Sequence, residues 1–228
     1  MFRKLLAAIG LGVSAVSGAT ASPPYSPYTS EAANAIYNLL FCDDSAAFKA
    51  KRGESPTPWQ AALFSVPANV PAVETLASDA SQEGRIRYLA FSKLRELGRP
   101  VPAKKLLGVI VEVPLAGGLD ALAAFSEGGV RYVNQSGKLV VVEGVASFLP
   151  MVKRLFAASE LVVSRIGPSD KPRLAPPTQS NVRLTFLVSD GLYFGEGPMS
   201  VMQRDAMAGP IIQQATELLQ AVVATGTK

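Results

Sequence analysis

The sequence predicts an α+β fold, in which long helices pack on a mostly antiparallel sheet of about six strands and a Pro-interrupted helical region precedes the sheet. Short apolar runs follow one another after residue 105 with brief connections, mostly rich in Gly, which favours antiparallel pairing. Apolar residues at helical spacing occur before, between and after these runs. With 228 residues, 48% of them hydrophobic and 18% charged, the chain is able to bury a sizeable core.

Residues 1–21 have the layout of a secretory signal peptide. Arg3 and Lys4 form a basic start, an uncharged apolar run covers 5–16, and small residues end at Ala21, where we expect cleavage. The apolar run is too short for a membrane span, which takes about 20 residues. We therefore expect a protein exported to the periplasm or secreted, with no transmembrane segment in the mature chain.

The remainder is expected to form a linker and one domain. Residues 22–30, rich in Pro and Ser, are predicted to be a linker, because their prolines oppose regular structure. Residues 31–228 are predicted to be a single α+β domain, as is usual for a chain of this length. The helical part of this domain covers 31–105, and the sheet with further helices covers 106–228.

Two helices are predicted in the helical part. Thr29 or Ser30 is suited to cap the first, which we expect to end near 43–44. Residues 45–80 contain several prolines and are expected to form only short helical pieces. The second helix is predicted over 82–97, with Gly98 following its last turn.

The strands and the remaining helices follow in a regular order. An almost unbroken apolar run at 106–113 is typical of a central strand covered on both faces. Further strands are predicted at 119–125, 130–135, 139–143, 182–189 and 192–195. Ser147 is suited to cap a helix over 148–166, an exposed Pro-rich loop is predicted at 167–181, and a final helix is predicted over 210–224.

The composition excludes several kinds of catalysis. The chain has no His and one Cys, so it has no Ser-His-Asp triad, no Cys-His pair and no His-ligated metal. No cofactor or metal site is predicted. Cys42 is interpreted as a small buried residue, because the acidic residues that follow it would disfavour a thiolate.

Carboxylates are the remaining candidates for acid–base chemistry. Glu143 and Glu196 both lie at or near predicted strand ends, and we expect them to share an edge of the sheet. A carboxylate pair would support hydrolysis of a glycoside. A Ser/Lys pair, Ser136 with Lys138, is a second candidate, although its position between two strand runs is typical of a turn.

The strongest charge asymmetry lies within 85–105, where cations outnumber acids. Arg85, Arg87, Lys93 and Arg95 lie on the predicted helix, and we interpret them as a contact surface for an acidic protein, a polyanion or an anionic membrane surface. The formal net charge of +4 falls to +2 without the two cations of residues 1–21, so no sequence-specific nucleic-acid binding is expected.

Two hypotheses about function follow from these observations. The first is an exported, non-enzymatic binding or interaction protein that contacts an anionic partner through its basic helix. The alternative is a His-independent hydrolase that uses the paired carboxylates or the Ser/Lys pair.

Overall fold

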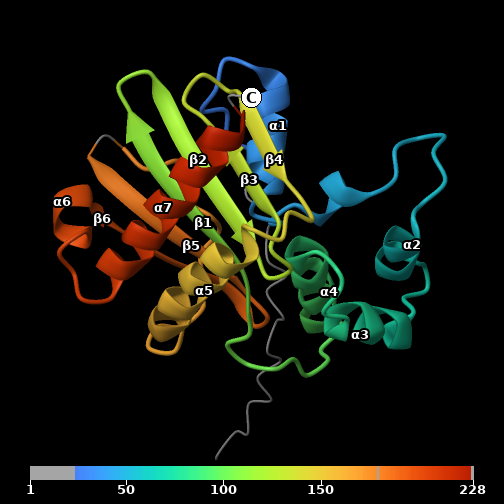
Figure 1. Cartoon of the computed structure of the whole chain (residues 1–228). Coiled ribbons are helices and arrows are strands. Elements are labelled where there is room, and N and C mark those ends of the chain that lie inside the picture. The colour runs from blue at the N-terminus through green and yellow to red at the C-terminus, as the bar shows by residue number, and fades with distance from the viewer. Residues whose placement is uncertain (1–23, 179, 227–228) are drawn as a thin grey trace, which may run out of the picture.

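The computed structural model describes residues 24–178 and 180–226 (Figure 1). The signal peptide predicted over 1–21 lies outside these residues. The helices are α1 (Glu31–Leu39), η1 (Ser45–Phe48), α2 (Pro58–Phe64), α3 (Val70–Ser78), α4 (Gly84–Glu96), α5 (Leu149–Val163), α6 (Met199–Met202) and α7 (Ala208–Gly226). The strands are β1 (Leu106–Leu115), β2 (Gly118–Phe125), β3 (Val130–Val133), β4 (Leu139–Val142), β5 (Asn181–Val188) and β6 (Gly191–Pro198).

The strands form one sheet in the order β4-β3-β2-β1-β5-β6, and every neighbouring pair is antiparallel. The predicted α+β class is confirmed, with the helical region before the sheet and about the expected number of strands. The continuous apolar run predicted to be a central strand is β1, which pairs with β2 on one side and β5 on the other. Among the described residues, no helix is both long enough and apolar enough to cross a membrane.

Helices cover both faces of the sheet, so side chains of β1 are buried on each side. Leu107 and Ile110 of β1 belong to a core shared with α1, α3 and α4. Val109 and Val111 belong to a second core, shared with α5 and α7, which lie across the other face in Figure 1. The residues from Val109 to Val111 alternate between the two cores, as the period of two of a pleated strand requires. The register shift between Leu106 and Gly108 interrupts this period, so Leu107 shares a core with Ile110.

Helix ends depend on local residues, and two of them differ from prediction. Ser30 caps α1 as predicted, and its side chain accepts a hydrogen bond from the Ala33 amide. The helix ends several residues before 43–44, because Cys42 has a positive φ of 55°, which no right-handed helix contains. Ser147 does not cap α5; Phe148 occupies that position and offers no side-chain acceptor.

Two segments predicted to be peripheral are packed against the helices and the sheet. In the segment predicted as a linker, Tyr28 is buried and donates a hydrogen bond from its hydroxyl to the Val133 carbonyl. In the predicted exposed loop, the side chain of Arg173 is only 3% exposed. Apart from Asn181, which begins β5, the described residues of both segments lack regular structure as expected, yet Tyr28 and Arg173 are tied to distant elements.

A carboxylate is buried in the centre of the sheet. Glu112 of β1 is 0% exposed, and the Tyr37 hydroxyl of α1 donates a 2.6 Å hydrogen bond to its Oε1. Arg183 of β5, which is paired with Glu112 in the strand register, places its Nη1 3.7 Å from Glu112 Oε2. Because a buried carboxylate without partners is strongly destabilising, this group favours the observed position of α1 on the sheet.

We predict that Tyr37→Phe lowers the free energy of unfolding by about 1–3 kcal/mol, because it removes the hydroxyl that donates to Oε1 of a buried carboxylate whose Oε2 accepts no hydrogen bond. Urea denaturation measures this change. Tyr193→Phe is the matched control, since the Tyr193 hydroxyl donates only to the half-buried Asp190 at 3.1 Å, and it should cost less. Equal losses in the two variants would contradict the role assigned to Glu112.

Candidate functional site

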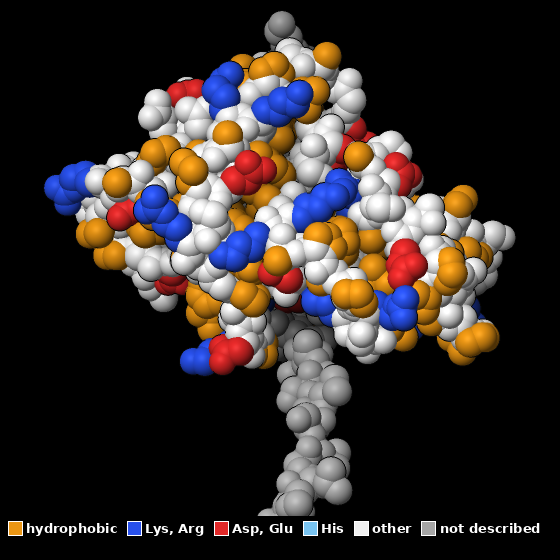
Figure 2. All heavy atoms as spheres, turned by 90° about the horizontal axis from the view of Figure 1, so that it is seen from below, with side chains coloured by type: hydrophobic (Ala, Val, Ile, Leu, Met, Phe, Trp, Pro, Cys, Tyr) orange, Lys and Arg blue, Asp and Glu red, His pale blue; other side chains and the backbone are white. Residues whose placement is uncertain are grey.

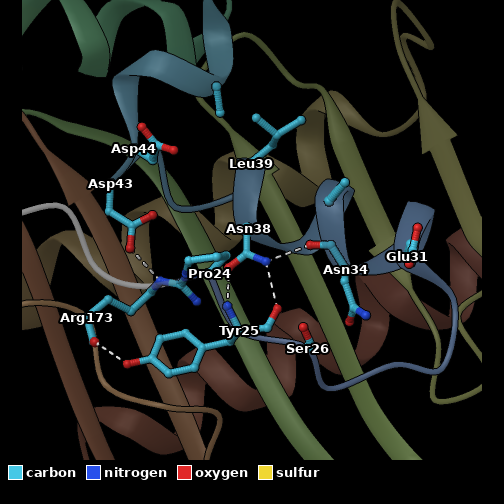
Figure 3. A pocket seen from close by; sticks show the side chains of 12 residues that line it. Pro24, Tyr25, Ser26, Glu31, Asn34, Asn38, Leu39, Asp43, Asp44 and Arg173 are labelled. Carbon is cyan, nitrogen blue, oxygen red and sulfur yellow. Dashed lines mark hydrogen bonds and ion pairs between the residues drawn. The ribbon is translucent and has the colours of Figure 1, made fainter.

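A pocket lies beside α1, and its cavity measures about 420 Å³ (Figure 3). Ligand pockets in proteins usually lie in the range of about 300–1,000 Å³. Four chain segments line this one, namely residues 24–26, α1, the loop 43–47 and Arg173. The lining of the pocket is therefore formed by residues that lie far apart in the sequence.

Tyr25 and Asn38 hold the first segment against α1. The Tyr25 amide donates to Asn38 Oδ1 at 3.0 Å, and Asn38 Nδ2 donates to the Tyr25 carbonyl at 2.7 Å. The Tyr25 hydroxyl donates to the Arg173 carbonyl at 3.0 Å. These bonds, drawn in Figure 3, hold one wall of the pocket in place.

Arg173 is the buried cation of the pocket. Its Nε donates to Asp43 Oδ2 at 2.7 Å, and its Nη2 donates to Asn38 Oδ1 at 2.6 Å. The guanidinium carbon also lies 4.1 Å from the centre of the Phe41 ring and 4.8 Å from that of Tyr25, which are cation–π distances. The remaining nitrogen, Nη1, is buried and has no hydrogen-bond partner.

The charge of the pocket lining is acidic. Glu31, Asp43 and Asp44 stand against Arg173 alone, and three carboxylates with one guanidinium leave a net charge of −2. Within the part of the chain that the structure describes, neither Glu31 nor Asp44 forms an ion pair. Apolar atoms of Pro24, Leu39 and alanines lie between these charges.

Buried polar groups continue from the pocket across the sheet. Arg183 donates to the Leu174 carbonyl at 3.1 Å, which holds the loop carrying Arg173, and its Nη2 lies 2.6 Å from Glu196 Oε2. Burial raises the pKa of Glu112, although the Tyr37 hydroxyl and the Arg183 guanidinium act in the opposite direction. Burial alone would raise the pKa of Glu196, but hydrogen bonds from Arg183 and Asn181 outweigh it and hold that pKa below its usual range.

The predicted pairing of Glu143 with Glu196 is wrong. Glu196 lies in β6 and Glu143 follows β4, and these are the two opposite edges of the sheet. Neighbouring strands are about 4.8 Å apart, so five strand spacings separate the two carboxylates by roughly 24 Å. A carboxylate pair for glycoside hydrolysis requires a separation below about 10 Å.

Glu143 instead lies in a hollow of about 260 Å³ with Glu83, Glu127 and Arg131. Arg131 Nη2 pairs with Glu143 and lies 3.4 Å from Glu83. Glu127 accepts a hydrogen bond from the Gly84 amide at 2.7 Å, and burial raises its pKa. These carboxylates are held by internal partners, and no group of metal-binding side chains occurs among the described residues.

The predicted basic contact surface on α4 is wrong for Arg87, which is 4% exposed. Its Nε donates to the Ala77 carbonyl and its Nη1 to Ser126 Oγ. Arg85 pairs with Glu83 and lies over the Phe125 ring. The reason is that α4 lies between α3 and the sheet, so that part of the helix face assumed to be solvated is covered.

The other two cations of α4 also have intramolecular partners. Lys93 pairs with Glu96, and Arg95 donates to the Ser189 carbonyl and lies over the Tyr88 ring. On the face shown in Figure 2, Lys and Arg side chains alternate with Asp and Glu rather than forming one basic area. We therefore do not retain α4 as the binding surface.

The remaining candidates have structural roles. Cys42 is free and buried, as interpreted from the sequence, and burial raises the pKa of its thiol. Ser136 and Lys138 lie in the turn between β3 and β4, where Asn134 Oδ1 accepts from the Ser136 hydroxyl and from both of their backbone amides. This contact pattern stabilises a turn and leaves the hydroxyl without a base.

Sequence reasoning missed Arg173 and Asn38, the residues that organise the pocket. Arg173 lies 135 positions from Asn38 and 130 from Asp43 in the sequence. No local spacing or periodicity connects residues at such separations. The only local signal is a single Arg within a Pro-rich loop, and such a residue is usually exposed.

Comparison with protein-family models, with curated proteins and with solved structures found no match to this chain. The functional conclusion below therefore depends on the chemistry of the site alone.

We predict that Arg87→Ala lowers the free energy of unfolding by about 1–3 kcal/mol, because it leaves the buried Ala77 carbonyl without this donor and removes a packed side chain. Arg99→Ala is the control, since that exposed residue pairs only with exposed Glu74, and its change should stay within about 0.5 kcal/mol. Urea titrations of the two variants make the comparison, and equal stabilities would contradict the internal role of Arg87.

Glu196 provides a prediction about pH. Its pKa is lower in the folded state, so its contribution to stability is present above the ordinary glutamate pKa of about 4.3 and is lost as pH falls through the folded value. The stability difference between the wild type and Glu196→Gln, measured by urea unfolding, should therefore be largest near neutral pH and disappear in strong acid. Glu160→Gln, on an exposed part of α5, should show no such trend.

Proposed function

We propose that this is an exported, non-enzymatic binding protein whose small-molecule ligand occupies the pocket between α1 and Arg173. The observation that supports it most is the cavity of about 420 Å³ itself, which lies in the usual size range of ligand pockets. Its lining includes the guanidinium-bearing Arg173, which is held in place by Asp43 and Asn38.

The pocket also has the mixed lining that is typical of ligand sites. Apolar atoms dominate, while a small number of charged groups provide orientation and specificity. Its wall made by Tyr25 and Asn38 is held by hydrogen bonds within the protein, and such a fixed wall reduces the entropy lost on binding.

The alternative of a His-independent hydrolase has weaker support. The two carboxylates predicted to pair are at opposite edges of the sheet, and the Ser/Lys pair lies in a turn. Among the described residues that line the pocket, the hydroxyl of Ser26 has no histidine or lysine beside it that could serve as its base.

The experiment that tests the proposal is native mass spectrometry of the protein purified from the host that produces it. We expect a chain that begins at Ser22, as export would require, and a retained small molecule. A chain with Met1 intact would contradict export, and release of no small molecule on denaturation would contradict binding.

We predict that Ala35→Trp abolishes retention of the small molecule, because Ala35 is an exposed residue of α1 that lines the pocket, and an indole there would fill the cavity. Ala157→Trp makes the same change at an exposed position of α5 and should leave retention unchanged. Circular dichroism confirms that both variants are folded. Equal retention by the two variants would place the ligand elsewhere.

A further inference from the structure

We infer that β4 is an interface between two copies of this chain, which pair through it in antiparallel orientation across a two-fold axis. The two six-stranded sheets would then join into one continuous sheet. β4 pairs with β3 on one side only, and it is the outermost strand at its edge of the sheet in Figure 1. Pairing of this kind is independent of the ligand proposed for the pocket.

The outer side of β4 carries unpaired backbone groups. The Asn134 amide donates to the Lys138 carbonyl at 2.9 Å, and hydrogen-bonded pairs alternate with non-bonded pairs along antiparallel strands. Val140 therefore bonds to β3, while Leu139 and Val141 direct their N–H and C=O groups away from it. No other described segment bonds to these outward groups, so a strand added at this edge would satisfy them.

The side chains of the same two residues are apolar and exposed. Leu139 is 40% exposed and Val141 is 46% exposed, and Val145, in the loop that follows β4, is also 46% exposed. The strand contains only Leu and Val, and the β-branched Val is favoured in paired strands. A partner strand would remove this apolar surface from water.

The opposite edge of the sheet is protected in ways that β4 is not. β6 carries Glu196 and ends at Pro198, which has no N–H to offer. The Ser169 amide, in the loop before β5, donates to the Leu192 carbonyl of β6 at 2.8 Å. Proline, charge and a covering loop are means by which proteins prevent edge pairing, and among the described residues β4 has none of these three.

The outward groups select one register for the pair. If Val140 of one copy lies opposite Val140 of the other, the outward groups of Leu139 meet those of Val141 in the second copy. The same register places these two exposed apolar side chains opposite each other. A register centred on Val141 would instead place Leu139 opposite the charged Glu143. The strand is therefore self-complementary in the first register, as a two-fold interface requires.

The charges at the two ends of β4 favour a second copy as the partner. Lys138 precedes the strand, is exposed and takes part in none of the ion pairs among the described residues. Glu143 follows the strand and lies in the hollow with Glu83, Glu127 and Arg131, where three carboxylates accompany one guanidinium. Antiparallel pairing brings Lys138 of each copy to the acidic end of the other strand, whereas parallel pairing would bring like charges together.

The short strand sets the strength of the contact. β4 has four residues, so the paired strands alone bury less than the roughly 1,200 Å² at which standard interfaces begin. We therefore expect a reversible dimer with a dissociation constant in the micromolar range.

Analytical ultracentrifugation of the purified protein, at concentrations from about 1 to 500 µM, tests the inference. Val141→Lys should raise the dissociation constant of the dimer about tenfold or more, because a two-fold interface loses the apolar pair twice. Val201→Lys makes the same change at a 56% exposed position on α6 and should leave the dissociation constant unchanged. Circular dichroism confirms that both variants are folded.

Disulfide trapping tests the register. In the proposed dimer the Cα atoms of the two copies of Val140 are about 4.5 Å apart, a distance that a disulfide spans. Val140→Cys should therefore give a covalent dimer under mild oxidation. Lys138→Cys is the matched control, since its two copies would be roughly 14 Å apart and should not cross-link. The native Cys42 is buried and should contribute no background.

Three results would overturn the inference. A monomer at every concentration would exclude a second copy as the partner of β4. A dimer that Val141→Lys leaves unchanged would use another surface. Cross-linking of the two Cys variants to the same extent would contradict the register centred on Val140.

Discussion

The buried carboxylate of Glu112 is the constraint on which the surrounding structure depends. It lies in the central strand, is fully buried, and is stabilised by Tyr37 from α1 and Arg183 from β5. Since an isolated charge in this position would be strongly destabilising, α1 and the sheet must pack with these groups in contact. The same Arg183 holds the Leu174 carbonyl, and thereby the loop that presents Arg173. The buried polar groups around Glu112 and the pocket are therefore connected through Arg183.

The buried hydrogen bonds explain why the pocket forms beside α1. Its lining comes from the segment before α1, from α1 itself, from the following loop and from the loop before β5. Each of these segments is irregular or short, and the conformational entropy of the chain would keep it from adopting one conformation on its own. Hydrogen bonds of Asn38 and of the Arg173 guanidinium connect the segments and thereby fix their conformation.

The arginines account for the largest difference between expectation and structure. A count of cations along α4 suggested a surface for an anionic partner, yet Arg87 is buried and Arg85 and Arg95 bond to internal groups. An Arg side chain combines a long apolar stem with a planar set of donors, so it is able to satisfy carbonyls and lie on rings inside a fold. In this protein the charge of a sequence segment therefore says little about the charge of the surface.

The sequence by itself determined the fold class and the order of the main helices and strands. The α+β class, the central position of β1, the short helical pieces before α4 and the antiparallel connections all follow from apolar periodicity, prolines and turn residues, which act within a single segment. Only the tertiary structure decided which charged residues are buried, which carboxylates are neighbours and where the pocket lies. Glu143 and Glu196 illustrate the difference, since strand order alone places them at opposite edges. Strand order and the contacts of Arg173 arise between residues far apart in the chain, and local patterns contain no information about such pairs.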